Sequence, residues 1–228
     1  MSLLAPFNGR VLNCSRESWE DVGDYNLILK SEMAYELGGG ILPAVSGLCF
    51  TSNQSLVGGN QVLVYGPDLD SIKGDSPFGR VTILSVSQDG LGEDDKAYAL
   101  MKQVEYTRYH VHPKGYMMRV STASGREPVR VGKEALDNGL NFGKVGSLFL
   151  KEYRKYPEVV SAKVIFITAP DFPYDEFSRL VKRTQTITES LNHIFNDLQM
   201  DCGTCGFKPV CDEVEGLREL HIKSLSVK

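Results

Sequence analysis

The sequence predicts an α+β protein, in which a mixed sheet with packed helices is followed by a helical, cysteine-bearing C-terminal segment. Short apolar runs rich in branched residues, such as 81–86 and 164–167, are typical of strands. Apolar residues spaced three and four apart through 133–156 and 174–200 predict long helices. Three of the five cysteines fall within 202–211, directly after the second of these helices.

The composition is that of an ordinary globular protein. A chain of 228 residues, 42% of them hydrophobic, predicts one large domain or a domain with an appendage. We expect an α+β domain over 1–170, with 1–30 as its lead-in, and a helix with the cysteine segment over 171–228. The net charge of −4 and the lack of a basic block argue against nucleic acid binding.

The sequence also predicts where the protein works. No signal pattern stands at the N-terminus, and the longest apolar runs are far shorter than the ~20 residues that a membrane span needs. Clustered cysteines, odd in number, fit metal ligation in a reducing compartment better than a disulfide framework. We therefore expect a cytoplasmic protein without a membrane partner.

The first fifty residues contain two short strand-like patches and a triple glycine. The patches are 11–15, which includes Cys14 as a packed thiol, and 25–29. Gly38 to Gly40 follow Glu36 and would cradle a phosphate, but they lack a P-loop lysine and G-x-G-x-x-G spacing. A turn between two strands is therefore favoured. Glu36 is either a ligand contact or, by default, an exposed strand residue.

The next segment predicts a strand over 62–65 that ends in a Gly-Pro-Asp turn. Asp68 and Asp70 fit turn formation and a helix cap better than a cation site. A helix is expected from Asp94, running into a strand around 108–111. His110 and His112 would then face one side of that strand, as half a zinc site or, more simply, as a surface pair.

Three arginines mark a candidate cofactor-binding group. Strands over 116–120 and 129–131 flank a turn, and Arg119, Arg126 and Arg130 lie on or beside them. Guanidinium groups bind phosphate oxygens in pairs, so this group would hold a phosphorylated cofactor. A solvated hairpin is the alternative.

The remaining elements lead to the cysteines. We expect a helix over 133–156 that Pro157 ends, a buried strand over 159–168 and a long helix over 174–200. A short helix over 212–224 would place Cys211 near a helix N-terminus, where the backbone charge stabilises a thiolate.

The cysteines have the spacing of a metal or cluster site. Cys202 and Cys205 are separated by two residues, and Cys211 follows after five more. Thiolates that converge on one point favour an iron–sulfur cluster. Zinc comes second, because paired C-x2-C motifs usually lie a dozen or more residues apart. A metal-free turn is the third alternative. His221 is the candidate fourth ligand, unless that position stays open.

The order of these features resembles a known family. From about Met33 to Ile194 the chain is similar to the middle domain of carbon monoxide dehydrogenase/acetyl-CoA synthase, in its acetyl-CoA synthase (β) subunit. The matching pieces are 33–39, 64–70 and 145–167, and the cysteine segment stands where that family carries its A-cluster. The resemblance implies an α+β fold. It also implies that Cys202, Cys205 and Cys211 correspond to three of the four thiolates that hold a four-iron (4Fe-4S) cluster.

The chain departs from the family in four ways. The spacing from the second to the third cysteine is shorter, and His221 stands in for the fourth cysteine. No Cys-Gly-Cys motif is present, which is the family's square-planar nickel site. The stretch that corresponds to the family's coenzyme A contact, 114–117, contains no tryptophan. Full acetyl-CoA synthesis at a two-nickel centre is therefore not expected.

Three functions remain as hypotheses. The first is an iron–sulfur accessory, electron-transfer or docking module of anaerobic one-carbon, acetyl-CoA or corrinoid metabolism, with a corrinoid or redox protein as partner. The second is an acyl- or methyl-group transferase that binds coenzyme A through its arginines. The third is a non-catalytic interaction protein with structural zinc. The sequence does not identify a catalytic residue.

Overall fold

The chain forms two β-sheets and four α-helices in a computed structural model that describes residues 2–12, 18–87, 94–119 and 126–195. The strands are β1 (Arg10–Leu12), β2 (Met33–Leu37), β3 (Ala44–Thr51), β4 (Gln61–Tyr65), β5 (Phe78–Val86), β6 (Tyr116–Met118), β7 (Val129–Gly132) and β8 (Val159–Ile167). The helices are α1 (Asp94–Thr107), α2 (Lys133–Asp137), α3 (Phe142–Tyr153) and α4 (Tyr174–Phe195). Short 3-10 turns are η1 (Ser2–Leu4), η2 (Gly23–Tyr25), η3 (Gln54–Leu56) and η4 (Leu69–Ser71). The predicted α+β class is confirmed.

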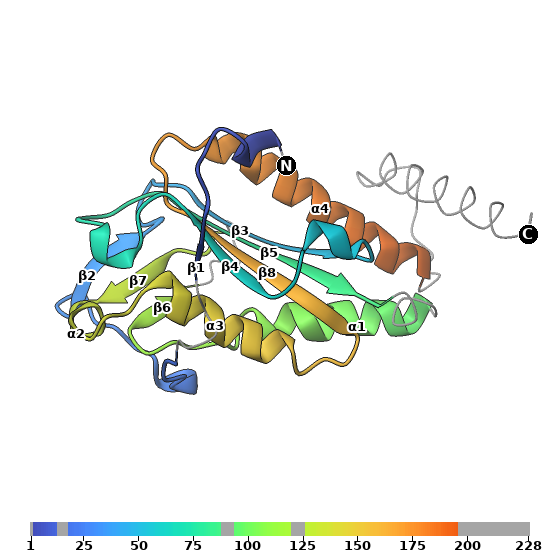
Figure 1. The fold of residues 1–228 in the computed structure, drawn as a ribbon, viewed down its shortest axis with the longest axis horizontal. Coiled ribbons are helices and arrows are strands. Elements are labelled where there is room, and N and C mark those ends of the chain that lie inside the picture. Colours follow the sequence, from blue (N-terminus) through green and yellow to red (C-terminus); the bar gives the residue numbers. More distant parts are fainter. Residues whose placement is uncertain (1, 13–17, 88–93, 120–125, 196–228) are drawn as a thin grey trace, which may run out of the picture.

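The larger sheet is mixed and has the strand order β1-β4-β8-β5-β3 (Figure 1). β8 is its central strand, parallel to β4 and antiparallel to β5. β3 runs parallel to β5 at one edge, and β1 runs antiparallel to β4 at the other. The pattern of β8 explains its central place, since most of its residues are buried and both faces of the strand are apolar.

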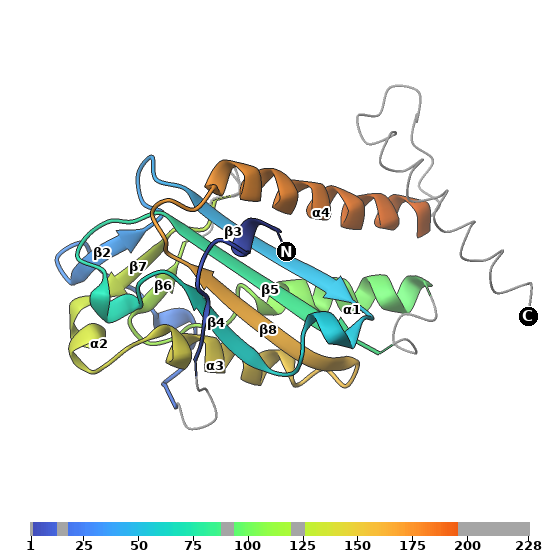
Figure 2. The same ribbon diagram turned by 45° about the horizontal axis from the view of Figure 1, so that its top comes forward.

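Helices cover both faces of this sheet (Figure 2). α3 and α1 lie on one face, where Val164 and Phe166 of β8 enter the larger buried cluster. α4 lies on the other face, where Ile165 and Ile167 pack with Phe177 of the helix. Successive strand residues point to opposite faces, so one strand supplies both clusters.

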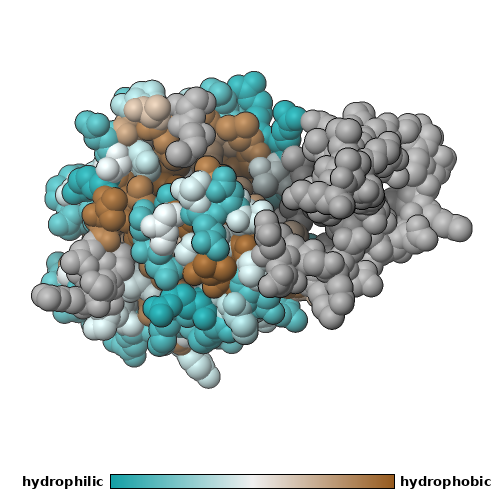
Figure 3. Space-filling view, turned by 45° about the vertical axis from the view of Figure 1, so that its right-hand side comes forward, coloured by the Kyte–Doolittle hydropathy of each residue, from teal (hydrophilic) through white to brown (hydrophobic). Residues whose placement is uncertain are grey.

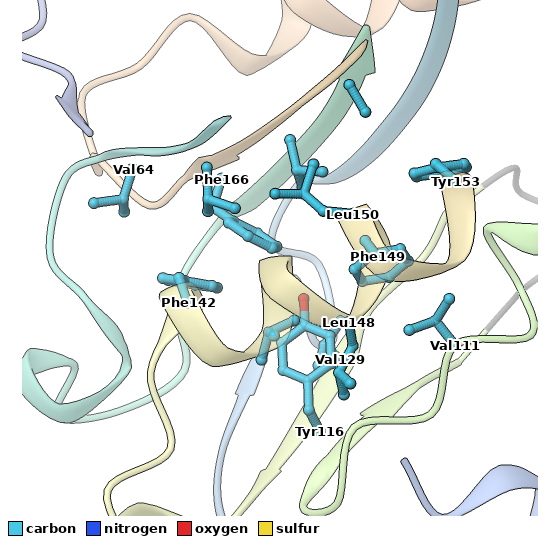
Figure 4. Close-up of a cluster of buried hydrophobic side chains, with 14 of the residues drawn as sticks. Val64, Val111, Tyr116, Val129, Phe142, Leu148, Phe149, Leu150, Tyr153 and Phe166 are labelled. Carbon is cyan, nitrogen blue, oxygen red and sulfur yellow. The ribbon is translucent and has the colours of Figure 1, made fainter. Parts of the chain in front are cut away.

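The larger cluster is centred on aromatic rings from the sheet and from α3 (Figure 4). Phe142 stacks on Phe166 with ring centroids 4.3 Å apart, and Phe78 stacks on both at 6.2 and 6.4 Å. Gly146 lets α3 approach β4, because a Cβ at that position would lie 2.4 Å from Val62 Cγ2. Burial of these aromatic rings contributes strongly to the stability of the larger cluster.

The smaller sheet is antiparallel, in the order β2-β7-β6, and lies at one end of the larger one (Figure 1). Val129 and Val131 of β7 are buried in the larger cluster, whereas Arg130 between them is half-buried on the opposite side. Residues 18–32 run along this outer side. Ile28 is buried there, and its backbone N–H lies 3.2 Å from Met117 Sδ.

Two of the predicted strands and one long helix are wrong. Tyr25 is the last residue of η2, and residues 26–29 follow it without joining a sheet. Residues 108–110 form turns after α1, so His110 and His112 do not lie on a strand. The helix predicted over 133–156 is two helices, because Gly139, with φ of 80°, reverses the chain between α2 and α3. The other predicted strands are present in the described residues, several with shifted ends, whereas residues 13–15 and 120 of the predicted strands lie outside those residues.

α4 begins at the predicted residue and packs on the sheet through Phe177 and Val181. The predicted domain boundary at residue 170 stays a prediction. The helix predicted over 212–224 lies outside the described residues, as does Cys14. On the face shown in Figure 3, apolar patches alternate with polar residues. None of the helices in the part of the chain that the structure describes is long and apolar enough to cross a membrane.

Candidate functional site

The three predicted cofactor-binding arginines gather around β2 and the turn that follows it. Arg119 Nη1 and Arg130 Nε both reach Glu36 Oε1, the latter at 3.4 Å. β2 and β7 are antiparallel neighbours, and their register places Glu36 directly opposite Arg130. The predicted basic group therefore exists, with Glu36 at its centre.

Arg126 holds the triple-glycine turn. Its Nη1 donates to Gly40 O at 2.7 Å, and its Nη2 donates to Gly38 O at 2.7 Å and to Leu42 O. Gly38 and Gly40 have φ of 66° and 56°, in the left-handed region that favours glycine. The triple glycine is thus the predicted turn between two strands, and Arg126 fixes its carbonyls.

The arginine group retains capacity for an anion at its outer edge. The Arg119 side chain is 45% exposed, whereas that of Glu36 is 15% exposed. A guanidinium has five N–H donors, so Arg119 has donors left after its contact with Glu36. Both terminal nitrogens of Arg126 already donate to carbonyls of the turn. Arg119 and Arg130 are therefore the better candidates for binding a phosphate.

A cleft of about 850 Å³ lies beside this group, between residues 18–32 and the start of α2. Its lining residues are Ser18, Trp19, Glu20, Val22, Tyr25, Asn26, Leu27, Ile28, Glu32, Lys114, Gly115, Gly132, Lys133, Glu134, Ala135 and Asn138. The volume is in the range typical of small-molecule sites.

Three small residues line one side of the cleft, which keeps it open. Gly115 has φ of 76°, and a Cβ there would lie 2.1 Å from Ala135 Cβ. Gly132 lies next to it, with its N–H donating to Gly115 O at 2.9 Å. Any larger side chain at Gly115 would push α2 away from β6, and the cleft would change shape.

The opposite wall is fastened by side chains from the lead-in. Trp19 Nε1 donates to Lys114 O at 2.8 Å, and Lys144 Nζ lies 4.7 Å from the Trp19 ring centroid. Asn26 Nδ2 donates to Tyr116 O at 2.8 Å and to Pro113 O at 3.0 Å, and its Oδ1 accepts from Gly115 N. These bonds hold residues 18–26 against the segment that leads into β6.

The cleft and the arginine group adjoin each other. Arg130 Nη1 donates to Ile28 O at 3.1 Å, and Ile28 lines the cleft. The cleft itself carries Glu20, Glu32 and Glu134 against two lysines, Lys114 and Lys133. A ring or an apolar group suits the cleft, whereas a phosphate is better placed at the arginines.

The predicted aspartates and histidines have structural partners. Asp68 Oδ1 accepts from Leu69 N at 2.7 Å and from Phe142 N at 2.9 Å, which confirms the helix-cap interpretation. His110 Nδ1 lies 2.7 Å from Tyr106 O, and its ring stacks on Tyr106. His112 Nε2 lies 3.8 Å from Asp24 Oδ1.

The predicted metal ligands, Cys202, Cys205, Cys211 and His221, all lie outside the described residues. Within residues 2–12, 18–87, 94–119 and 126–195, no group of three or more candidate ligands has the arrangement of a metal site. Cys49, a free cysteine in β3, is half-buried between the sheet and α4.

The sequence did not reveal a buried ion cluster formed by Arg80 of β5, Arg108 after α1 and Glu127 before β7. Arg80 Nη2 lies 2.9 Å from Glu127 Oε2, and Arg108 Nη2 donates to Glu127 Oε1. Burial raises and the two guanidinium charges lower the pKa of Glu127, with a net lowering from its ordinary value. The one signal in the sequence is an arginine inside the apolar run of β5.

Comparison with known proteins adds no family. No model of a known protein family matches the chain, and a search of curated proteins gives no match either.

Proposed function

We propose that the chain is an acetyl-CoA-synthase-like protein that binds a four-iron iron–sulfur cluster through Cys202, Cys205 and Cys211. It acts in the cytoplasm as an accessory, electron-transfer or docking module of anaerobic one-carbon, acetyl-CoA or corrinoid metabolism. The observation that carries this proposal is the compact C-x2-C-x5-C spacing of three thiols. A corrinoid or redox protein would be the partner.

The position of α4 before the cysteines supports the proposal. The described part of α4, which packs on the sheet, reaches Phe195, and Cys202 stands seven positions later in the sequence. His221 or an external ligand would complete the cluster. With three thiolates, one iron would be open to a ligand from a partner.

Anaerobic reconstitution tests this function. After incubation with iron and sulfide, we expect about four iron and four sulfide ions per chain. The visible spectrum should show the broad absorption that is typical of four-iron clusters. Cys205→Ser should lose most of the iron. Cys49→Ser is the matched control, because Cys49 lies in β3, and it should keep the cluster.

Two outcomes would overturn the proposal. A reconstituted protein without bound iron and with an unchanged visible spectrum would exclude the cluster. About one zinc and no iron in protein purified without oxygen would instead support the structural-zinc alternative.

A second candidate function, coenzyme A binding for acyl or methyl transfer, is favoured by one further observation. The stretch that the resemblance equates with the family's coenzyme A contact, 114–117, lines the cleft through Lys114 and Gly115. It lacks a tryptophan of its own, but the Trp19 indole is hydrogen-bonded to its first carbonyl. The arginine group lies alongside, where phosphates would bind.

The only tryptophan of the chain gives a direct assay for this candidate. We expect coenzyme A to change the fluorescence of Trp19, because the indole forms part of the cleft wall. Arg119→Gln and Arg130→Gln should weaken the response, each about tenfold. Arg179→Gln is the control, because Arg179 lies on α4, which contributes no residue to the cleft lining. No response to coenzyme A, with both replacements silent, would exclude this function.

A further inference from the structure

α4 lies across one face of the larger sheet (Figure 2) and carries an exposed leucine on its outward side. Leu180 is 49% exposed, whereas Phe177 and Val181 on the sheet side of the helix are buried. Glu176 stands one turn before Leu180, and residues four apart lie on the same face of a helix. Arg179 is exposed beside it. A single exposed leucine is ordinary on a protein surface, so its meaning depends on the surface that surrounds it.

An open pocket of about 590 Å³, which we call the α4 pocket, lies at the start of the same helix. Three of its lining residues, Asp175, Glu176 and Arg179, belong to α4. The rest of the lining is mostly apolar and includes Leu42, Pro43, Pro77, Pro170, Phe172 and Pro173. Proline has no backbone N–H, so these prolines offer no donor to a polar ligand. The α4 pocket therefore suits an aliphatic side chain that has basic groups close by.

The α4 pocket is held in shape by contacts within the chain. Leu42 O accepts a hydrogen bond from Arg126 Nη2. The Phe172 ring packs against the rings of Phe7 and Phe177, with centroid distances of 5.4 and 5.6 Å. A partner would therefore meet a pocket that is already formed, and little conformational entropy would be lost on binding.

The charge along the exposed side of α4 changes sign after its first turn. Asp175 and Glu176 lie in the first turn, and Arg179 and Lys182 follow them along the helix. All four residues are exposed. When two copies of α4 lie antiparallel, the acidic turn of each one meets the basic residues of the other, whereas parallel copies would place like charges together. This surface is therefore complementary to a second copy of itself.

We propose that two copies of the chain associate through this surface, with their α4 helices antiparallel about a twofold axis. Leu180 of each copy enters the α4 pocket of the other. The basic residues beside Leu180 then face the acidic first turn of the other helix. Leu180 lies only about 6 Å along the helix from Glu176 of the α4 pocket. The projecting residue and the pocket thus belong to one patch, so the contact is isologous and closes at two copies.

The surface is small, so we expect a reversible dimer. It comprises the first turns of α4 and the residues of the α4 pocket. A contact of this extent is at the small end of stable interfaces, and we expect a dissociation constant of about 1–100 µM. Because the charged residues on α4 are exposed, the dimer should weaken as the salt concentration rises.

Sedimentation equilibrium of the full chain, in a buffer with a thiol reductant, tests the association. The reductant prevents disulfide cross-links between copies. The mass should rise from 25.3 kDa toward twice that value as the concentration rises from about 1 to about 200 µM. The mass of a single chain at every concentration would overturn the proposal.

Leu180→Asp assigns the association to α4. Leu180 is half exposed, so the variant should fold. Its carboxylate would face the acidic residues of the other copy's α4 pocket, which should raise the dissociation constant by about tenfold or more. Leu29→Asp is the matched control, because Leu29 is 53% exposed and lies in the lead-in beside the smaller sheet. It should keep the wild-type dissociation constant. The same dissociation constant in both variants would contradict the assignment.

Charge reversal tests the antiparallel arrangement. Asp175→Lys with Glu176→Lys makes this side of α4 basic, and Arg179→Glu with Lys182→Glu makes it acidic. Each double variant alone should be monomeric, because like charges then meet across the twofold axis. An equimolar mixture of the two should form a heterodimer. If both double variants dimerise alone as well as the wild type does, the interface lies elsewhere and the proposal fails.

A matched control and a second readout keep the test independent of folding. Lys151→Glu with Arg154→Glu reverses two exposed charges at the C-terminal end of α3 and should keep the wild-type mass. Lysines in the first turn of α4 oppose the helix dipole. If that variant fails to fold, unchanged dimerisation of both the acidic double variant and Leu180→Asp still refutes the contact.

Discussion

At the scale of single residues, arginines do different work according to what surrounds them. Arg126 is bonded to three carbonyls of one turn, whereas Arg119, whose side chain is 45% exposed, makes an ion pair with Glu36. Both were predicted as cofactor contacts because they stand close together in sequence. The difference between them depends on a turn more than eighty residues away in sequence, so no local pattern would reveal it.

Replacing Arg126 should therefore cost far more stability than replacing Arg119. Arg126→Met leaves three carbonyls of the triple-glycine turn without their donor, and we expect a loss of about 2–3 kcal/mol in the free energy of unfolding. Arg119→Met should cost about 0–1 kcal/mol, because the guanidinium is half exposed and Glu36 keeps Arg130 as a partner. Urea unfolding of both variants measures the difference. Equal losses would contradict the assignment of Arg126 to the turn.

At the scale of elements, helices and strands were predicted correctly where the element is buried either on one face or on both. β5 and β8 are read directly from their branched, apolar runs, and α4 is read from its apolar stripe. Residues 25–29 are also a short, mostly apolar run, but they follow the surface of the smaller sheet and do not pair with its strands. A strand needs a partner as well as a pattern, and partners are not visible in a single sequence.

The contact between Gly115 and α2 should control the shape of the cleft. In Gly115→Ala the new Cβ meets Ala135 at a φ of 76°, so we expect a loss of about 2 kcal/mol or more. The Trp19 emission should shift, because the cleft wall must move. Gly74→Ala is the matched control, since nothing lies within 4 Å of the added Cβ. It should change stability by less than about 0.5 kcal/mol. Equal effects at both glycines would contradict this account of the cleft.

At the scale of the whole molecule, the buried cluster ties together parts that are distant in sequence. Arg80 and Arg108 come from β5 and the end of α1, Glu127 precedes β7, and Ser46 lies in β3. The α+β class follows from the sequence because it depends on local periodicity. The cluster does not, because each of its charged residues taken alone would be predicted on the surface. The cysteine site remains a prediction from spacing.

Glu127 should make the stability of the molecule depend on acid pH. Its pKa is below the ordinary value of 4.5 in the folded protein. Its contribution is therefore present above pH 4.5 and is lost as the pH falls through the lower, folded value. Glu127→Gln should lose about 3–5 kcal/mol at neutral pH, because two buried guanidiniums lose their counter-charge. It should also show a flatter pH dependence in the acid range.

Urea unfolding from neutral pH to below pH 4.5 checks both statements. Glu134→Gln serves as control, because Glu134 lies at the cleft and not in the cluster. It should follow the wild-type curve. A Glu127→Gln protein as stable as the wild type would mean that the cluster does not hold the elements together.

The position of β8 has a consequence for synthesis on the ribosome. β8 is the last strand among the residues that the structure describes but the centre of the larger sheet, where Val164 pairs with Val62 and Thr82. Until residues 159–167 have left the ribosome, β4 and β5 lack the strand that joins them. The sheet therefore closes late and in one step. α4 is the next element to emerge and the cysteine segment follows it, so the three clustered cysteines leave the ribosome after every described strand of the larger sheet.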